Sequence, residues 1–172
     1  MDIEAIVAKV TQEVYARLAE TQTGEKPARA PMLSGAELAG KLEHSLLNPD
    51  TSADKIRQGC EEAKKYGFAN VCVSPYFVTF AKERLGGSNV GICVPVGFPH
   101  GAASTNAKCA EIREAILNGA TELDVSLQIV ANKSGDFAAV EKDLCEMISV
   151  AGGRAKVKGI YEQGLLAHDE KQ

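Results

Sequence analysis

The chain has 172 residues, of which 45% are hydrophobic and 24% are charged, a composition typical of a globular protein. Its 19 basic and 23 acidic residues leave a formal net charge of −4, which argues against a generally basic nucleic-acid binder. No run of residues approaches the ~18 apolar residues of a membrane span, and the start M-D-I-E is unlike a secretory signal. We therefore expect a cytoplasmic protein that binds neither nucleic acid nor membrane.

Residues 1–20 have the pattern of an amphipathic helix, with hydrophobic residues recurring at helical spacing among charged ones. Residues 21–33 are polar and contain Pro27 and Pro31, which favours a flexible linker. A short amphipathic helix on such a linker resembles the encapsulation peptides of bacterial microcompartment cargo enzymes. An oligomerisation helix or an extra packing helix fits the same pattern. Residues 34–172 are expected to form the globular domain.

From residue 34 onward, helix and strand signals alternate along the chain. Glycine follows each of the longer predicted helices, as is common where a helix ends. The predicted elements are a helix from Ser34 to about Glu43, a helix over 52–66, a strand over 69–74, a helix from Pro75 to Leu85, a strand over 89–96, a helix over 104–117, a strand over 121–127, a helix over 137–150 and a strand over 155–162. The last residues resemble the start of another helix.

Four successive βα units predict a parallel sheet with right-handed crossovers, either a doubly wound open sheet or part of a β/α barrel. Every predicted strand has one bulky apolar face and one small or polar face. In the third strand, for example, Leu123 and Val125 point away from Asp124. A doubly wound sheet is covered on both faces and should contain continuously apolar strands. The alternation favours a barrel whose polar inner face holds a site, although a merely solvated face is the alternative.

The length limits the barrel interpretation. A complete eight-stranded β/α barrel takes about 250 residues and rarely under 200. We therefore expect a half-barrel, with about four of the eight units of a TIM-type barrel.

Asp124 and Lys158 are the strongest candidates for chemistry. Both are predicted on the polar face of adjacent parallel strands, where an acid and an amine can form a hydrogen-bonded proton relay. Burial lowers the pKa of a lysine, which would suit a base or an imine-forming nucleophile. A structural ion pair explains the same two residues. The loop V-G-F-P-H-G at 96–101 has no nucleotide-binding glycine fingerprint, and its His100 is expected to be solvated.

The cysteines and histidines do not predict a metal site. The five cysteines have an odd count, form no C-x-x-C pair and lie among apolar neighbours, which favours reduced thiols that are mostly small core residues. The three histidines lack metal-ligand spacing with any cysteine or histidine, so no metal or other cofactor is expected. These residues are Cys60, Cys72, Cys93, Cys109 and Cys145, and His44, His100 and His168.

Six segments, in order along the chain, resemble deoxyribose-phosphate aldolase. The similarity extends from about Leu38 to the C-terminus. The segments are E-H-S-L-L-N-P-D at 43–50, E-E-A-K-K-Y-G-F-A-N-V-C-V-S-P-Y at 61–76, V-G-F-P-H-G at 96–101, N-G-A-T-E-L-D-V at 118–125, K-S-G-D at 133–136 and K-V-K-G-I-Y-E-Q-G-L-L at 156–166.

The resemblance implies an eight-stranded β/α barrel that cleaves 2-deoxyribose 5-phosphate to glyceraldehyde 3-phosphate and acetaldehyde through a lysine imine, or Schiff base. It assigns Asp124 to the proton relay, Lys158 to the strand-four lysine beside it and Cys72 to the wall of the pocket. Glu43 stands where the family has aspartate, and Gln163 where it has threonine. The sequence contains no K-T-S-T-G-type segment with the imine lysine, and it also lacks the later lysine that lowers the pKa of the first.

Two hypotheses follow. In the first, the chain is an aldolase-like lyase that handles a sugar phosphate or aldehyde and is inactive until a second polypeptide supplies the rest of the barrel. Asp124 and Lys158 would be catalytic, and Cys72 and Glu43 would bind substrate. In the second, the half-barrel is a non-catalytic binding or assembly module that pairs through its open strand edges with itself or a partner. In either case, residues 1–20 are a candidate contact for a microcompartment shell.

Overall fold

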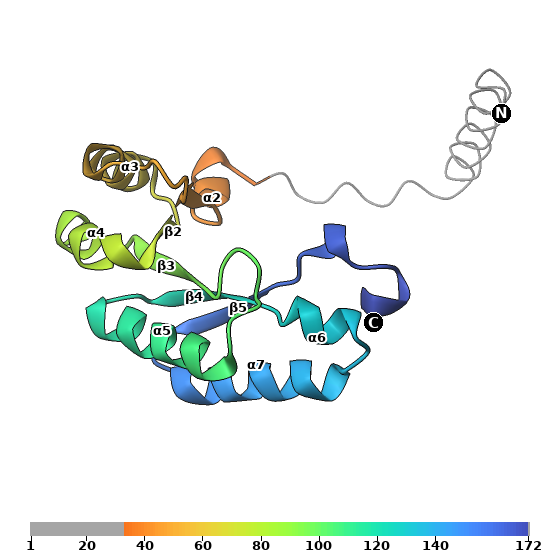
Figure 1. Ribbon diagram of the computed structural model, residues 1–172. Helices are drawn as coiled ribbons and strands as arrows, with labels where there is room; N and C mark the ends of the chain where they lie inside the picture. Colours follow the sequence, from red (N-terminus) through yellow and green to blue (C-terminus); the bar gives the residue numbers. More distant parts are fainter. Residues whose placement is uncertain (1–32, 172) are drawn as a thin grey trace, which may run out of the picture. The chain divides into compact units, whose positions relative to one another are not determined.

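The computed structural model describes residues 33–171, and the residues from Gly35 onward form one compact unit (Figure 1). The predicted amphipathic helix at 1–20 lies outside the described residues, as does the linker except for its last residue, Leu33.

Five parallel strands form a single sheet in the order β1-β2-β3-β4-β5. The sequence predicted only four of them. The missing one is β1, whose sequence E-H-S-L is short and mostly polar. The predicted first helix ended at about Glu43, and residues 44–46 were assigned to no element. That helix, α2 (Gly35–Ala39), ends before Gly40 instead. The strands are β1 (Glu43–Leu46), β2 (Asn70–Val73), β3 (Gly91–Val96), β4 (Glu122–Ser126) and β5 (Lys156–Ile160).

The four longer helices lie close to their predicted positions, and three of them begin at a local side-chain cap. The Ser52 side chain accepts a hydrogen bond from the backbone N–H of Lys55, and Gly67 ends the same helix in the left-handed region at φ 69°. The structure adds a short helix, α6, in a predicted loop, and the C-terminal residues form 3₁₀ turns. The helices are α3 (Ala53–Tyr66), α4 (Val78–Leu85), α5 (Thr105–Asn118), α6 (Ile129–Lys133) and α7 (Phe137–Ala151), and the 3₁₀ turns are Pro75–Phe77, Gln163–Leu165 and Asp169–Lys171.

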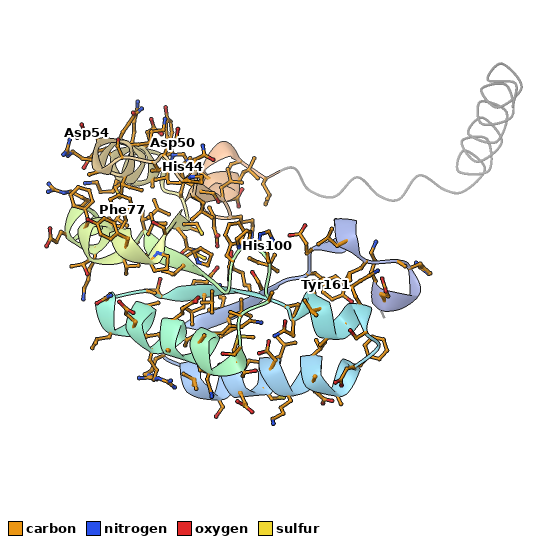
Figure 2. All side chains as sticks on the ribbon, in the orientation of Figure 1. His44, Asp50, Asp54, Phe77, His100 and Tyr161 are labelled. Atoms are coloured by element: carbon orange, nitrogen blue, oxygen red, sulfur yellow. The ribbon has the colours of Figure 1, made fainter. Side chains whose placement is uncertain are left out.

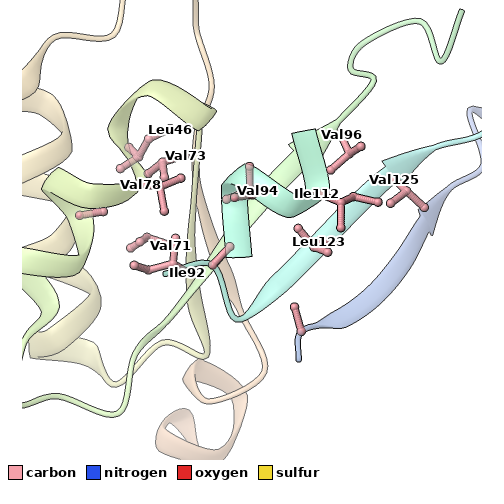
Figure 3. Packing of buried hydrophobic residues seen from close by; sticks show 14 of the residues in the cluster. Leu46, Val71, Val73, Val78, Ile92, Val94, Val96, Ile112, Leu123 and Val125 are labelled. Carbon is pink, nitrogen blue, oxygen red and sulfur yellow. The ribbon is translucent and has the colours of Figure 1, made fainter. Parts of the chain in front are cut away.

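The hydrophobic core lies between one face of the sheet and the helices α3, α4, α5 and α7 (Figures 1 and 3). Val71, Val94 and Leu123 point into it from three successive strands and are almost completely buried. Ile112 of α5 and Met147 of α7 pack against this layer. Burial of each such side chain contributes about 1.5–3 kcal/mol, so the alternation of the strands fixes which face the helices cover. The polar side chains are thereby directed to the opposite face.

In the described part of the chain, β1 and β5 each pair with a single strand and are therefore the edges of the sheet. None of the helices within residues 33–171 is long and apolar enough to cross a membrane.

Candidate functional site

The polar face of the sheet gathers charged side chains around the ammonium group of Lys158. Lys158 lies on β5 directly beside Asp124 of β4, because the two residues are register partners in the parallel pair. Its Nζ donates a hydrogen bond to Glu43 Oε1, which comes from the far edge of the sheet. The same Nζ lies 2.7 Å from Glu122 Oε1 and 3.1 Å from Asp124 Oδ1. One lysine thus joins three strands.

The carboxylates have further partners. Asn70 Nδ2 donates a hydrogen bond of 3.1 Å to Glu43 Oε1, and Lys156 Nζ lies 3.0 Å from Glu122 Oε2. The contact between Lys158 and Asp124 is an ion pair without hydrogen-bond alignment, so the enclosed Asp124 Oδ1 has no hydrogen bond. That oxygen is held by the ion pair with Lys158 alone.

These contacts set the protonation of the cluster. Partial burial disfavours the charged form of Lys158, but hydrogen bonding and ion pairing with Glu122, Glu43 and Asp124 outweigh it and raise its pKa above the ordinary lysine value. The sequence had led us to expect a lowered pKa, and this was wrong because burial was weighed without the three carboxylates. Burial likewise opposes ionisation of Glu122, yet hydrogen bonds from Lys158 and others lower its pKa to about 2.

Two thiols lie beside the carboxylates. Cys72 of β2 and Cys93 of β3 are register partners, and both are buried. A hydrogen bond with Cys72, together with burial and the nearby negative charges, raises the pKa of the Cys93 thiol. The donor atoms of Glu43, Cys72, Cys93 and Asp124 all lie within 4.8 Å of one another. The sequence had led us to expect no metal site, because the cysteines and histidines lack metal-ligand spacing along the chain. That spacing does not reveal donors that lie far apart in the sequence and are brought together by parallel strands.

The structure brings together all four residues predicted for the site: Asp124, Lys158, Cys72 and Glu43. Lys158 is on the fifth strand rather than the fourth, because β1 was not predicted. Sequence reasoning did not assign a role to three neighbours, Asn70, Cys93 and Glu122. Their signal was the strand alternation itself, which places each of them on the polar face.

The loop after β3 lies near this face. His100 is exposed on that loop, as expected (Figure 2). A cavity of about 250 Å³ is lined by Leu47, Ser74, Pro95 and Phe98, which lie at or just beyond the carboxyl ends of β1, β2 and β3. β/α barrels bind substrates at this end of their strands.

The chain resembles aldolases in both structure and sequence. Its five parallel strands and outer helices are consistent with part of a TIM-type β/α barrel. Solved structures that match its fold include aldolases. One is a provisionally assigned deoxyribose-phosphate aldolase from Coccidioides immitis, with a TM-score of 0.78 and 31% identity over 92% of this chain and 64% of that one. Another is the tetrameric deoxyribose phosphate aldolase from Aeropyrum pernix, with a TM-score of 0.70 and 29% identity over 80% of this chain and 57% of that one.

The sequence relatives are likewise deoxyribose-phosphate aldolases. The enzyme of that name from Bacillus mycoides (strain KBAB4) is 42% identical over 134 residues, which are 78% of this chain and 60% of the relative. No protein-family profile matches the sequence. The similarity expected from the motifs is thus confirmed by sequence and by structure. The chain spans about 60% of the length of the curated relatives that it matches.

Proposed function

We propose that this chain is an aldolase-like lyase, and that as part of a complete β/α barrel it cleaves 2-deoxyribose 5-phosphate to glyceraldehyde 3-phosphate and acetaldehyde. One observation carries the proposal: Lys158 contacts both Asp124 and Glu43 on the polar face. The resemblance assigns Asp124 to the proton relay and Lys158 to the lysine beside it, and Glu43 stands where the family has aspartate. The cavity at the carboxyl ends of the strands provides a route for a small substrate.

The charge state of Lys158 limits its role in class I cleavage. Imine formation needs a neutral amine to attack the substrate carbonyl with loss of water. The carboxylates around Lys158 raise its pKa and hold the ammonium form, so Lys158 is suited to stabilise negative charge rather than to release a proton. Asp124, whose Oδ1 has no hydrogen bond, is suited to accept a proton directly or through water. A different lysine, from a strand beyond β5, is therefore required for the imine.

Borohydride trapping with acetaldehyde tests this assignment. Residues 1–172 alone should give no reduced adduct in mass spectrometry, because Lys158 remains protonated and ion-paired. Adding a polypeptide that carries the remaining strands of a related aldolase should produce the adduct on that polypeptide and restore cleavage. An adduct on Lys158 of the isolated chain would contradict the role given to this residue, and its K158R variant would identify the site.

A second candidate function, a non-catalytic assembly module, is favoured by the surface beside β5. A groove of about 500 Å³ is lined by side chains that include Phe137, Leu144, Ile148 and Tyr161 of α7 and the segment after β5. Unpaired backbone groups of an edge strand next to apolar side chains favour association with a second polypeptide or a second copy. The A. pernix relative is tetrameric.

Association with a microcompartment shell rests on the sequence of residues 1–20 alone. Fusing residues 1–24 to a fluorescent reporter in cells that make shells tests it. We expect punctate fluorescence, and a diffuse signal would remove the targeting proposal.

A further inference from the structure

We propose that the polar face of the sheet also binds one divalent metal ion of the zinc class, held by Glu43, Cys72, Cys93 and Asp124 in exchange for the Lys158 ammonium. The proposal concerns binding and does not depend on the aldol chemistry proposed above. It rests on donor geometry, on the charge of the site and on the identity of the donors.

The donors come from four successive strands, one from each of β1 to β4, and all lie within 4.8 Å of one another. Tetrahedral zinc, with bonds of about 2.3 Å to sulfur and 2.0–2.2 Å to oxygen, places neighbouring donors about 3.3–3.8 Å apart. The widest pair must therefore close by about 1 to 1.5 Å. The two cysteine positions are fixed by strand pairing, whereas the flexible Glu43 and Asp124 side chains can make this adjustment.

The charge of the site favours a cation. Three carboxylates, Glu43, Glu122 and Asp124, face two ammonium groups, those of Lys156 and Lys158. The site thus already holds a cation and retains an excess of negative charge. When a metal ion replaces Lys158 at Glu43 and Asp124, the lysine keeps its 2.7 Å contact with Glu122 Oε1. Asp124 Oδ1, which accepts no hydrogen bond, exchanges its ion pair with Lys158 for a bond to the metal ion.

The donor set selects the kind of metal. An acidic cluster that served only to pair with lysines would not need thiols, yet Cys72 and Cys93 lie against each other beneath it. Neither thiol belongs to the hydrophobic cluster that contains Cys60 and Cys109. Two sulfurs with two carboxylate oxygens suit Zn²⁺ or Co²⁺, whereas Mg²⁺ and Ca²⁺ favour oxygen donors throughout.

Binding requires thiolates, so the proton balance is part of the proposal. One M²⁺ binds two thiols with release of two protons, and no electron is transferred. Affinity should therefore fall as the solution becomes more acidic.

Cobalt titration of the full chain under anaerobic, reducing conditions tests the site. We expect one Co²⁺ per chain, with intense sulfur-to-cobalt charge-transfer absorption and the visible bands of tetrahedral cobalt, displaced by Zn²⁺. The C93A variant should weaken binding by at least about 100-fold, since it removes a ligand, whereas loss of a supporting partner alone costs 10–100-fold. The matched control is C145A, which removes the exposed thiol on α7 and should leave the titration unchanged.

The K158M variant gives a second, opposite prediction. It removes the competing ammonium and should tighten cobalt binding by about tenfold or more, because two carboxylates are freed. Far-ultraviolet circular dichroism establishes that each variant is folded, and C93A decides the question if K158M does not fold. Absence of sulfur-to-cobalt absorption, binding unaffected by C93A, or binding lost in C145A would each overturn the proposal. No substrate or second polypeptide is used, so failure of the aldolase proposal would leave this result unchanged.

Discussion

Glu122 is the residue whose ionisation links the site to folding. Its side chain is only 8% exposed and contacts both Lys158 and Lys156. Its pKa is about 2 in the folded chain, below the ordinary value of 4.5. A lowered carboxyl pKa means that the stabilisation is complete above the unfolded pKa and is lost as the pH falls towards the folded one.

The E122Q variant measures this contribution. We expect it to lower the free energy of unfolding by about 1–3 kcal/mol at pH 7, because the charged hydrogen bonds to two lysines are lost. Urea denaturation at pH 7 and pH 3 should show a smaller difference between wild type and variant at the lower pH. An equal difference at both values would contradict the lowered pKa of Glu122.

At the residue scale, strand alternation made Asp124 and Lys158 predictable, because neighbouring parallel strands place alternate side chains on a common face. Glu43 was found only through the resemblance, since its strand was not predicted. The lysine pKa was wrongly predicted because its sign depends on three carboxylates, and the contact with Glu43 spans 115 positions in the sequence. The pairing of Cys72 with Cys93 was not predicted for the same reason, because strand register is set only in the folded sheet.

At the scale of elements, a buried ion pair holds α5 and α7 against the sheet. Lys108 of α5 is fully buried, and its Nζ lies 2.8 Å from Asp143 Oδ2 of α7 and 3.1 Å from the carbonyl oxygen of Ser126. Thr105 donates a hydrogen bond to the other oxygen of Asp143. Gly97 leaves room for this lysine, because an added Cβ would lie 3.0 Å from Lys108 Cε. The pair therefore supports the carboxyl end of β4, the strand that carries Glu122 and Asp124.

Substitutions at this pair should be strongly non-additive. D143L should destabilise the fold by about 3–5 kcal/mol, because it leaves the Lys108 ammonium buried without its counter-ion. The K108M/D143L double variant should recover most of that loss, since an apolar pair requires no desolvation of charge. A double-mutant cycle measured by urea denaturation checks this. Additive effects of the two single substitutions would contradict the coupling.

Element boundaries were predictable where local chemistry sets them. Ser52 and Gly67 bound α3 through a side-chain cap and a left-handed residue, both of which sequence signals identify. β1 was missed because four mostly polar residues become a strand only through pairing with β2. Lys108 was missed for a similar reason: a lysine in a helix normally faces solvent, and only the tertiary fold supplies its buried partner.

At the scale of the whole molecule, the groove along α7 extends to Tyr161, the residue that follows the edge strand β5. Ile148 is 55% exposed and Phe137 56% exposed, and both line the groove. Figure 1 shows α7 on the outer side of the sheet, next to β5. Apolar side chains beside an unpaired strand edge are expected to be covered by another polypeptide or another copy of this chain.

The I148E variant tests whether this surface mediates self-association. We expect the wild-type chain to associate at micromolar concentration and I148E to weaken the association by about tenfold or more, because a charge in an apolar contact loses its hydration. Sedimentation equilibrium gives the dissociation constants. The matched control is L117E, at a leucine of α5 that is 82% exposed and lies outside the groove. Both positions are exposed, so stability should change by only about 0.5 kcal/mol in each variant. Equal weakening by the two variants would show that the groove does not mediate the association. A monomeric wild-type chain would contradict self-association and leave a complementing polypeptide as the candidate to cover the groove.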